Sequence, residues 1–140
     1  MIKHKPVFIA GHPRPKGSWT PVKTKYGIKL RPSSHATAVW CKYAKEEIKK
    51  IWKHPIIEGP VRLDLTFFLP KPKTIDREYP TGSYEGDGDK LDRGVWDALT
   101  GTVYKDDCQV VEWSGVKKYS KKIGVSIKVT VLDEYQSRYI

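Results

Sequence analysis

Hydrophobic and polar residues alternate most clearly from Val61 to Leu69, where every second side chain is apolar. A period of two is typical of a strand with one face in the core. Two further apolar-rich segments, at about 109–119 and 125–131, predict strands that close the chain. A shorter apolar run at 7–10 predicts a strand near the N-terminus. The pattern therefore predicts about four strands.

Apolar residues recur at helical spacing in two other segments. The first predicted helix begins near Ser33 or Ser34, either of which suits an N-cap, and runs to about Trp52. The second covers 89–99 and ends before Gly101, a residue that suits a helix C-terminus.

The remaining segments are rich in polar residues, proline and glycine. Residues 71–88 predict a loop, and 135–140 predict a tail. Residues 11–34 predict a basic loop or arm, either flexible or folded as a hairpin around Tyr26. The order of elements predicts an α+β fold, with a small mixed sheet of about four strands flanked by two main helices. We expect a single domain spanning 1–140.

The formal net charge of the 140-residue chain is +10, and the cations are unevenly distributed. The first 55 residues carry a charge of +11 and the rest carry −1. This asymmetry favours an anionic partner, and nucleic acid is favoured over membrane because no strongly amphipathic basic helix stands out. A basic protein with no anionic partner is the alternative. The N-terminal apolar run is too short for a signal peptide, so a cytoplasmic location is expected.

Six aspartates fall within 21 residues of this otherwise basic protein. They are Asp87, Asp89, Asp92, Asp97, Asp106 and Asp107. Asp87 and Asp89 are two residues apart around Gly88, which allows a tight turn, so both carboxylates can converge on one side. Asp106 and Asp107 follow the second helix and are expected to return toward them. Because hard cations such as Mg²⁺ prefer oxygen ligands, the cluster predicts a metal site.

Such a site would activate water and neutralise a scissile phosphate. Arg93 shares a helix face with Asp89 and Asp97 and could pair with phosphate, and Lys90 adds a cation at the same rim. The alternative is structural, because two aspartates at this spacing more often cap a helix or form a turn. Asp92 and Asp97 are expected on a solvated or salt-bridged face. Zinc-dependent and nucleotide-hydrolysing enzymes are disfavoured, because the histidines lack metal-binding spacing and the sequence has no phosphate-binding glycine loop.

The acidic segment resembles the RusA-type Holliday-junction resolvases, a family of small endonucleases of bacteria and their phages. The family pattern D-x-D-N-L-x-K-x-x-x-D-A-L matches residues 87–99, and its D-D-x-Q-V matches 106–110. The resemblance implies a homodimer, dependent on Mg²⁺ or Mn²⁺, that nicks two symmetric strands of a four-way DNA junction. Neither a nucleotide cofactor nor a membrane partner is expected, because the sequence has no phosphate-binding glycine motif and no apolar run of membrane-spanning length.

The resemblance further implies that Asp87, Asp89 and Asp107 are the metal-binding catalytic carboxylates, with Asp106 as a possible further ligand. Arg93 stands at the position of the family's catalytic lysine, and Lys90 stands where the family has asparagine. Arginine keeps the positive charge but not the geometry or proton-transfer ability of lysine.

DNA contacts are expected from the basic segment 11–34, with Lys90 beside the acidic site. The cations predicted to bind phosphates there are Arg14, Lys16, Lys23, Lys25, Lys29 and Arg31. Trp19 or Tyr26 could stack on unpaired bases. The alternatives are that Trp19 packs on the edge of the sheet and that the cations are simply solvated.

The sequence thus predicts a metal-dependent endodeoxyribonuclease that resolves four-way junctions in DNA recombination and repair. Two alternatives remain open. One is a DNA-binding protein with weak or no catalysis, which the arginine at position 93 suggests. The other is a metal-dependent nuclease acting on other branched or single-stranded DNA.

Overall fold

The structure is a computed structural model that describes residues 1–14, 19–32 and 35–133. Within elements, only the backbone is described for 19–22, 29–32 and 35–38. The predicted tail and the predicted N-cap serines lie outside the described residues.

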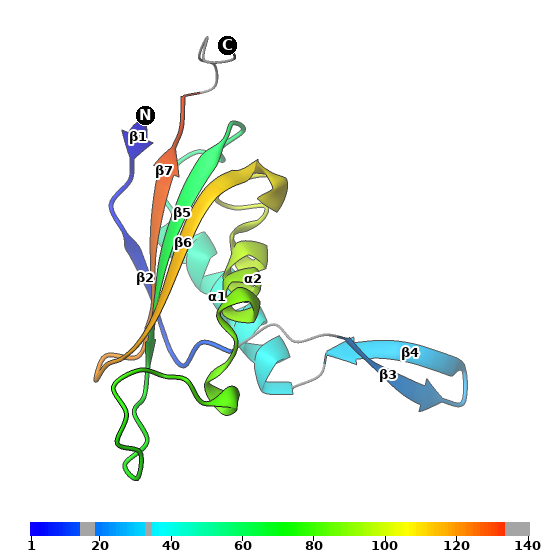
Figure 1. Ribbon diagram of the computed structural model, residues 1–140. Coiled ribbons are helices and arrows are strands. Elements are labelled where there is room, and N and C mark those ends of the chain that lie inside the picture. The colour runs from blue at the N-terminus through cyan, green and yellow to red at the C-terminus, as the bar shows by residue number, and fades with distance from the viewer. Residues whose placement is uncertain (15–18, 33–34, 134–140) are drawn as a thin grey trace, which may run out of the picture.

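The main sheet has five strands and is mixed (Figure 1). Strand β7 (Gly124–Val131) runs antiparallel to β5 (Val61–Leu69) on one side and to β1 (Ile2–Lys3) and β2 (Val7–Ala10) on the other. Strand β6 (Val110–Tyr119) pairs in parallel with β5 and forms the far edge. The predicted α+β class is confirmed, and the short β1 adds one strand to the four expected.

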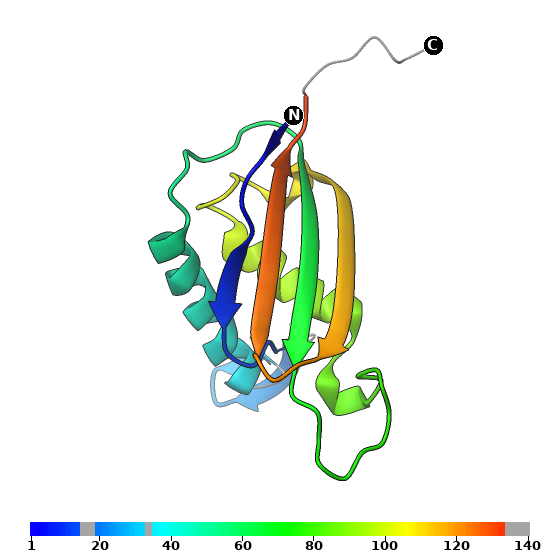
Figure 2. The same ribbon diagram turned by 90° about the vertical axis from the view of Figure 1, so that its left-hand side faces the viewer.

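Two helices pack on one face of this sheet, and no helix of the described residues covers the other face (Figure 2). Helix α1 (His35–Ile51) contacts β2, and helix α2 (Gly88–Leu99) contacts β6 and α1. Gly94 lies at the helix crossing, where an added Cβ would sit 3.6 Å from the ring of Trp40 and 3.8 Å from Sγ of Cys41. Both distances are ordinary van der Waals contacts, so the two helices pack directly against each other at Gly94.

The alternating pattern of β5 buries every second residue under the helices, as the sequence predicts. Val61, Leu63 and Leu69 are fully buried, and Trp40 and Trp52 of the α1 segment also join the core. Burial of this apolar surface holds the helices on the sheet. No helix among the described residues is long and apolar enough to cross a bilayer.

Strands β3 (Trp19–Thr24) and β4 (Gly27–Pro32) form a separate antiparallel hairpin. It projects from the helix side of the molecule (Figure 1). At its turn the hydroxyl of Thr24 donates to the carbonyl of Gly27 at 2.8 Å, and the N–H of Tyr26 donates to that hydroxyl at 3.2 Å. Of the two forms expected for this segment, the structure shows the hairpin.

Candidate active site

A short 3-10 turn, η1 (Ser83–Glu85), delivers the chain to the first aspartate of the acidic segment. Gly86 follows with φ of 98°, a conformation that favours glycine, whereas Gly88 is already the first residue of α2. The tight turn predicted at Gly88 is therefore made by Gly86. From its side chain in β6, Lys117 donates to the carbonyl of Gly86 at 2.9 Å and fixes this turn.

A buried ion pair holds the turn from the other side. The carboxylate of Glu85 is only 4% exposed, and it accepts hydrogen bonds from Arg77 and from the N–H of Gly82. Burial alone would raise the pKa of Glu85, but hydrogen bonds from Tyr119, Arg77 and Gly82 hold that pKa below its ordinary value. Glu85 is thus a structural anion that orders the chain before Asp87.

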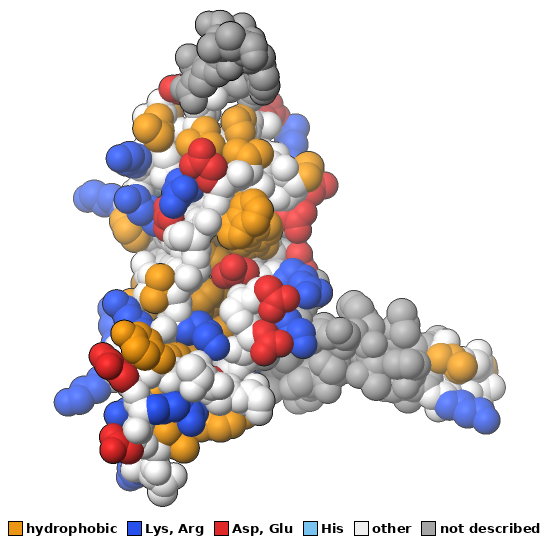
Figure 3. Space-filling view, viewed as in Figure 1, with side chains coloured by type: hydrophobic (Ala, Val, Ile, Leu, Met, Phe, Trp, Pro, Cys, Tyr) orange, Lys and Arg blue, Asp and Glu red, His pale blue; other side chains and the backbone are white. Residues whose placement is uncertain are grey.

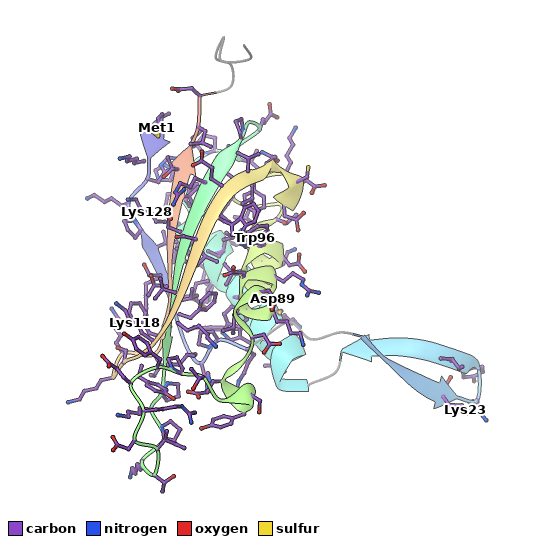
Figure 4. All side chains as sticks on the ribbon, viewed as in Figure 1. Met1, Lys23, Asp89, Trp96, Lys118 and Lys128 are labelled. Atoms are coloured by element: carbon purple, nitrogen blue, oxygen red, sulfur yellow. The ribbon has the colours of Figure 1, made fainter. Side chains whose placement is uncertain are left out.

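Asp87 is the N-cap residue of α2, but its side chain makes no capping hydrogen bond. Its carboxylate is 63% exposed and lies 3.4 Å from Nζ of Lys90. Asp89, in the first turn of the helix, is 74% exposed and lies 3.7 Å from the guanidinium of Arg93. Figure 4 shows Asp89 projecting from α2 away from the sheet. Both carboxylates are therefore accessible to a cation or to a positively charged partner group.

The second acidic pair lies at the other end of α2. Asp106 caps a short 3-10 turn, η2 (Asp107–Gln109), by accepting a hydrogen bond from the N–H of Cys108 at 3.0 Å. Hydrogen bonds from the backbone N–H and the thiol of Cys108 lower the pKa of Asp106. Gln109 pins the same turn through two bonds from its side-chain amide, to the carbonyls of Ile57 at 2.8 Å and Gly59 at 2.9 Å.

Asp107 and Asp106 line a pocket with a volume of about 580 Å³ between the two helices. Asp97 of α2 and two lysines of α1, Lys42 and Lys45, share the same pocket. Carboxylates and cations in one open pocket suit a cation and the phosphate that it binds. Asp97, expected on a solvated or salt-bridged face, thus lies with Asp107.

The two acidic groups do not meet within one chain. Asp89 and Asp97 are eight residues apart, which is about 12 Å along a helix axis. Among the described residues, no three Asp, Glu, His or Cys side chains come together as a group that could hold a metal ion. The cause is the short connection after α2, which Tyr104 pins by donating its hydroxyl to the carbonyl of Trp96 at 2.9 Å. The return of Asp106 and Asp107 toward Asp87, expected from the sequence, therefore stops at the C-terminal end of α2.

Asp92 lies on another side of α2, beneath strand β6. It lines a second pocket, of about 350 Å³, together with Trp113, Ser114, Gly115 and Lys117. One carboxylate oxygen of Asp92 is buried without a hydrogen-bond partner. Burial, and then the nearby charge of Asp89, raise the pKa of Asp92 to about 6.

The predicted DNA-contact residues are only partly described. Lys23 and Lys25 are exposed near the tip of the hairpin (Figure 4), and Nζ of Lys25 lies 5.1 Å from the ring centroid of Tyr26. The ring of Tyr26 is 79% exposed, so it is available for stacking. Lys16 lies outside the described residues, as do the side chains of Trp19, Lys29 and Arg31. Arg14 is half-buried at the base of the arm.

A protein-family model described as endodeoxyribonuclease RusA matches residues 11–130. The chain belongs to this family. The match includes the hairpin, both helices, both acidic groups and most of the sheet. The RusA resemblance seen in the acidic segment is thereby confirmed over most of the chain.

One curated protein is similar to this RusA-family chain, a Bacillus subtilis (strain 168) protein described as uncharacterized protein YqaN. The two are 32% identical over 84 residues. The matched region is 53% of this chain and 59% of the relative, so the chain covers less than two thirds of the relative's length.

Several residues that shape this RusA-family site were not singled out from the sequence. Lys117 and Glu85 order the turn before Asp87, and Lys42 and Lys45 line the pocket of Asp107. Gln109, which anchors the turn that contains Asp107, also belongs to this group, and it is the one member that the sequence could have indicated, because it is part of the quoted family pattern. The others come from distant segments, and no local spacing relates them to the aspartates.

Proposed function

We propose that this protein is a metal-dependent endodeoxyribonuclease that resolves four-way DNA junctions by paired symmetric nicks. The observation that carries the proposal is the arrangement along α2, in a chain of the RusA family. Accessible carboxylates lie at both ends of this helix, and Arg93 lies between them. The same activity would serve DNA recombination and repair.

Asp87 and Asp89 fit a hard divalent cation such as Mg²⁺ or Mn²⁺. Both are exposed oxygen donors at the start of one helix, and neither is used as a cap within the chain. Mg²⁺ is typically bound by one or two carboxylates together with waters and substrate phosphates. The metal, when bound, would supply activation of water and neutralisation of phosphate charge. Asp107, with Asp106 and Asp97 in the adjoining pocket, offers a second set of oxygen donors.

Arg93 and Lys90 are proposed to bind phosphate charge at this site. Each lies within 4 Å of one aspartate, so DNA phosphate can exchange for the carboxylate as their partner. Arg93 would stabilise the charge that develops on the phosphate, which needs its cationic donors but no proton transfer.

The hairpin is proposed to contact the DNA arms. It projects on the helix side of the sheet, the side that also carries Asp89 (Figure 4). Lys23 and Lys25 would contact phosphates, and the exposed ring of Tyr26 would stack where bases are unpaired. The remaining cations of the arm, Arg14, Lys16, Lys29 and Arg31, together with Trp19, are proposed to belong to the same surface.

A homodimer is proposed because a four-way junction has two-fold symmetry and needs two matched nicks. The test is incubation of the purified protein with a synthetic four-way junction and with either Mg²⁺ or Mn²⁺. We expect paired nicks at symmetric positions in at least one metal. Tight binding without nicks in either metal would instead support a non-catalytic DNA-binding protein. Preferential cleavage of flaps or Y-shaped DNA would support a nuclease for other branched substrates.

A further inference from the structure

The edge strand β6 is unpaired on its outer side within the described part of the chain. It is ten residues long and pairs only with β5. Proteins normally block such an edge with proline, bulges or a covering segment, because its free N–H and C=O groups can pair with another strand. Strand β6 contains no proline. Its register with β5 shifts once, between Val61 and Arg62, and is regular from Arg62 to Leu69.

Large apolar side chains are exposed along this edge strand. Val111, Trp113 and Val116 are 53%, 57% and 50% exposed. Trp113 lies on the helix face of β6, and Val116, three residues on, lies on the opposite face. The ring of Trp113 packs edge-on against Trp96 of α2, with centroids 5.4 Å apart, so the apolar surface continues from strand to helix. Figure 3, viewed as Figure 1, shows hydrophobic side chains gathered over β6 and α2 at the centre of this face. An apolar patch on a free strand edge is typical of a protein-protein interface.

The charges of β6 are complementary to a second copy of the same strand. If two β6 strands pair antiparallel about a two-fold axis at Gly115, Glu112 of one copy lies opposite the partner's Lys118. The symmetric pair occurs at the other end, so two opposite-charge pairs form on one face. On the helix face, Trp113 lies opposite the partner's Lys117, and because Nζ of Lys117 is hydrogen-bonded to the carbonyl of Gly86, its aliphatic stem would face the ring.

Glycine at the centre of this register leaves room for the close approach. Gly115 would face the partner's Gly115, and neither carries a side chain that could collide. The space above Gly115 is already limited on the helix side, because an added Cβ would lie 3.0 Å from the Asp92 carboxylate. Glycine within a strand often marks such a close backbone approach.

We propose that the β6 edge is the dimer interface, paired antiparallel with β6 of a second copy about Gly115. This interface proposal rests on the proposed function, because it identifies the surface through which the proposed homodimer forms. The joined sheet would be continuous across the two-fold axis. Because α2 contacts β6, the two α2 helices would lie near one another on the same face. Both acidic sites and both hairpins would then face one side, as two matched cuts in one junction require.

Disulfide crosslinking tests the register directly. In a Cys108→Ser background, which removes an exposed native thiol, Glu112→Cys and Lys118→Cys are introduced together. The double variant should form a disulfide-linked dimer on non-reducing gels, because the thiol at position 112 of one copy faces the thiol at position 118 of the other. Each single variant should stay uncrosslinked, because no thiol then faces it. Crosslinking by the single variants as efficient as by the pair, or none by the pair, would overturn the proposal.

Sedimentation of the full chain, without DNA or metal, tests the interface separately from catalysis. Lys118→Glu places like charges opposite each other twice per dimer and should raise the dimer dissociation constant by about tenfold or more. The matched control is Lys121→Glu in the neighbouring turn, which should leave the dimer unchanged.

A wild-type chain that stays monomeric, or equal effects of the two variants, would overturn the interface, and the edge would then be open to another partner. If the protein is a monomer and still nicks junctions, the proposed interface is refuted and the proposed nuclease function is not. A crosslinked dimer that cleaves no DNA refutes the nuclease function alone.

Discussion

The side chain of Lys117 donates a hydrogen bond of 2.9 Å to the carbonyl of Gly86, the residue directly before Asp87. This contact joins the edge strand of the sheet to the turn that presents the first acidic residue. Since Gly86 has a left-handed backbone conformation, the turn depends on such external support to keep one geometry. The turn that presents Asp87 is therefore fixed by a residue 31 positions away from Gly86 in the sequence.

Replacing Lys117 by methionine should loosen this turn while leaving the core intact. We expect a several-fold higher Mg²⁺ requirement for junction cleavage and a loss of about 1 kcal/mol in the free energy of unfolding. Cleavage rates measured over a range of Mg²⁺ concentrations, with urea unfolding in parallel, provide the check. Lys121→Met, at an exposed turn position, is the control. Identical metal dependence in both variants would contradict a positioning role for Lys117.

Replacing Asp87, Asp89 or Asp107 singly by asparagine should abolish junction cleavage and leave junction binding intact. The amide keeps the shape of each side chain but removes the charge that a divalent cation requires. Gel-shift and cleavage assays on the same junction measure the two properties. Asp76→Asn, in the exposed loop before η1, is the matched control and should stay active. Full activity of any of the three variants would remove that residue from the site.

Substitutions of Arg93 can show whether the residue stabilises charge on the phosphate or transfers a proton. We expect Arg93→Met to reduce the single-turnover cleavage rate by about 10²-fold, because a cationic donor to the phosphate is lost. Arg93→Lys should retain the wild-type rate or exceed it, since it restores the residue of the family pattern. Lys90→Met tests the neighbouring cation in the same assay. A fully active Arg93→Met variant beside an inactive Lys90→Met variant would transfer the role to Lys90.

Asp92 makes stability depend on pH. Its pKa in the folded protein is raised to about 6, so the folded state holds the proton more tightly than the unfolded state does. The free energy of unfolding should therefore fall as the pH rises from about 4 to about 6 and stay lower above that range. Asp92→Asn should stabilise the protein at pH 7 by about 1 kcal/mol, reduced by solvent screening of this half-exposed group.

Urea unfolding of Asp92→Asn and the wild type at the two ends of this pH range measures the effect. The advantage of the variant should vanish near the acidic end, where Asp92 is protonated in both states. An advantage that is equal at both ends would show that packing, and not ionisation, is responsible.

The hairpin lysines should contribute to DNA affinity without affecting the fold. Lys23→Gln combined with Lys25→Gln should weaken junction binding and reduce the slope of log affinity against log salt by about two per protomer, or about four for the proposed dimer, one for each lost phosphate contact. Lys3→Gln combined with Lys5→Gln, near the N-terminus and remote from the hairpin (Figure 1), removes the same charge as a control. Equal loss of affinity in both double variants would indicate a general charge effect only.

Most of the fold could be predicted from the sequence. The alternation in β5 and the helical spacing in α1 are local patterns, because each follows from the period of the backbone itself. The family motif also identified the acidic residues by type and spacing. The added strand β1 had too little apolar pattern to be predicted, since it is two exposed residues paired with β7.

The arrangement of the aspartates is where local reasoning was insufficient. Spacing correctly placed Asp87 and Asp89 at the start of a helix, but it could not show where the chain leads after that helix. Tyr104 and Gln109 pin the connection to Trp96 and Ile57, and this tertiary anchoring keeps Asp107 beside Asp97.

The sequence by itself determined the elements, the acidic and basic residue types and the family, because these depend on patterns within one segment. Only the tertiary structure decided which carboxylates share a pocket, that Glu85 and Lys117 order the turn, and that β6 is a free apolar edge. These properties depend on contacts between distant segments, and burial and hydrogen bonding fix such contacts only when the whole chain folds.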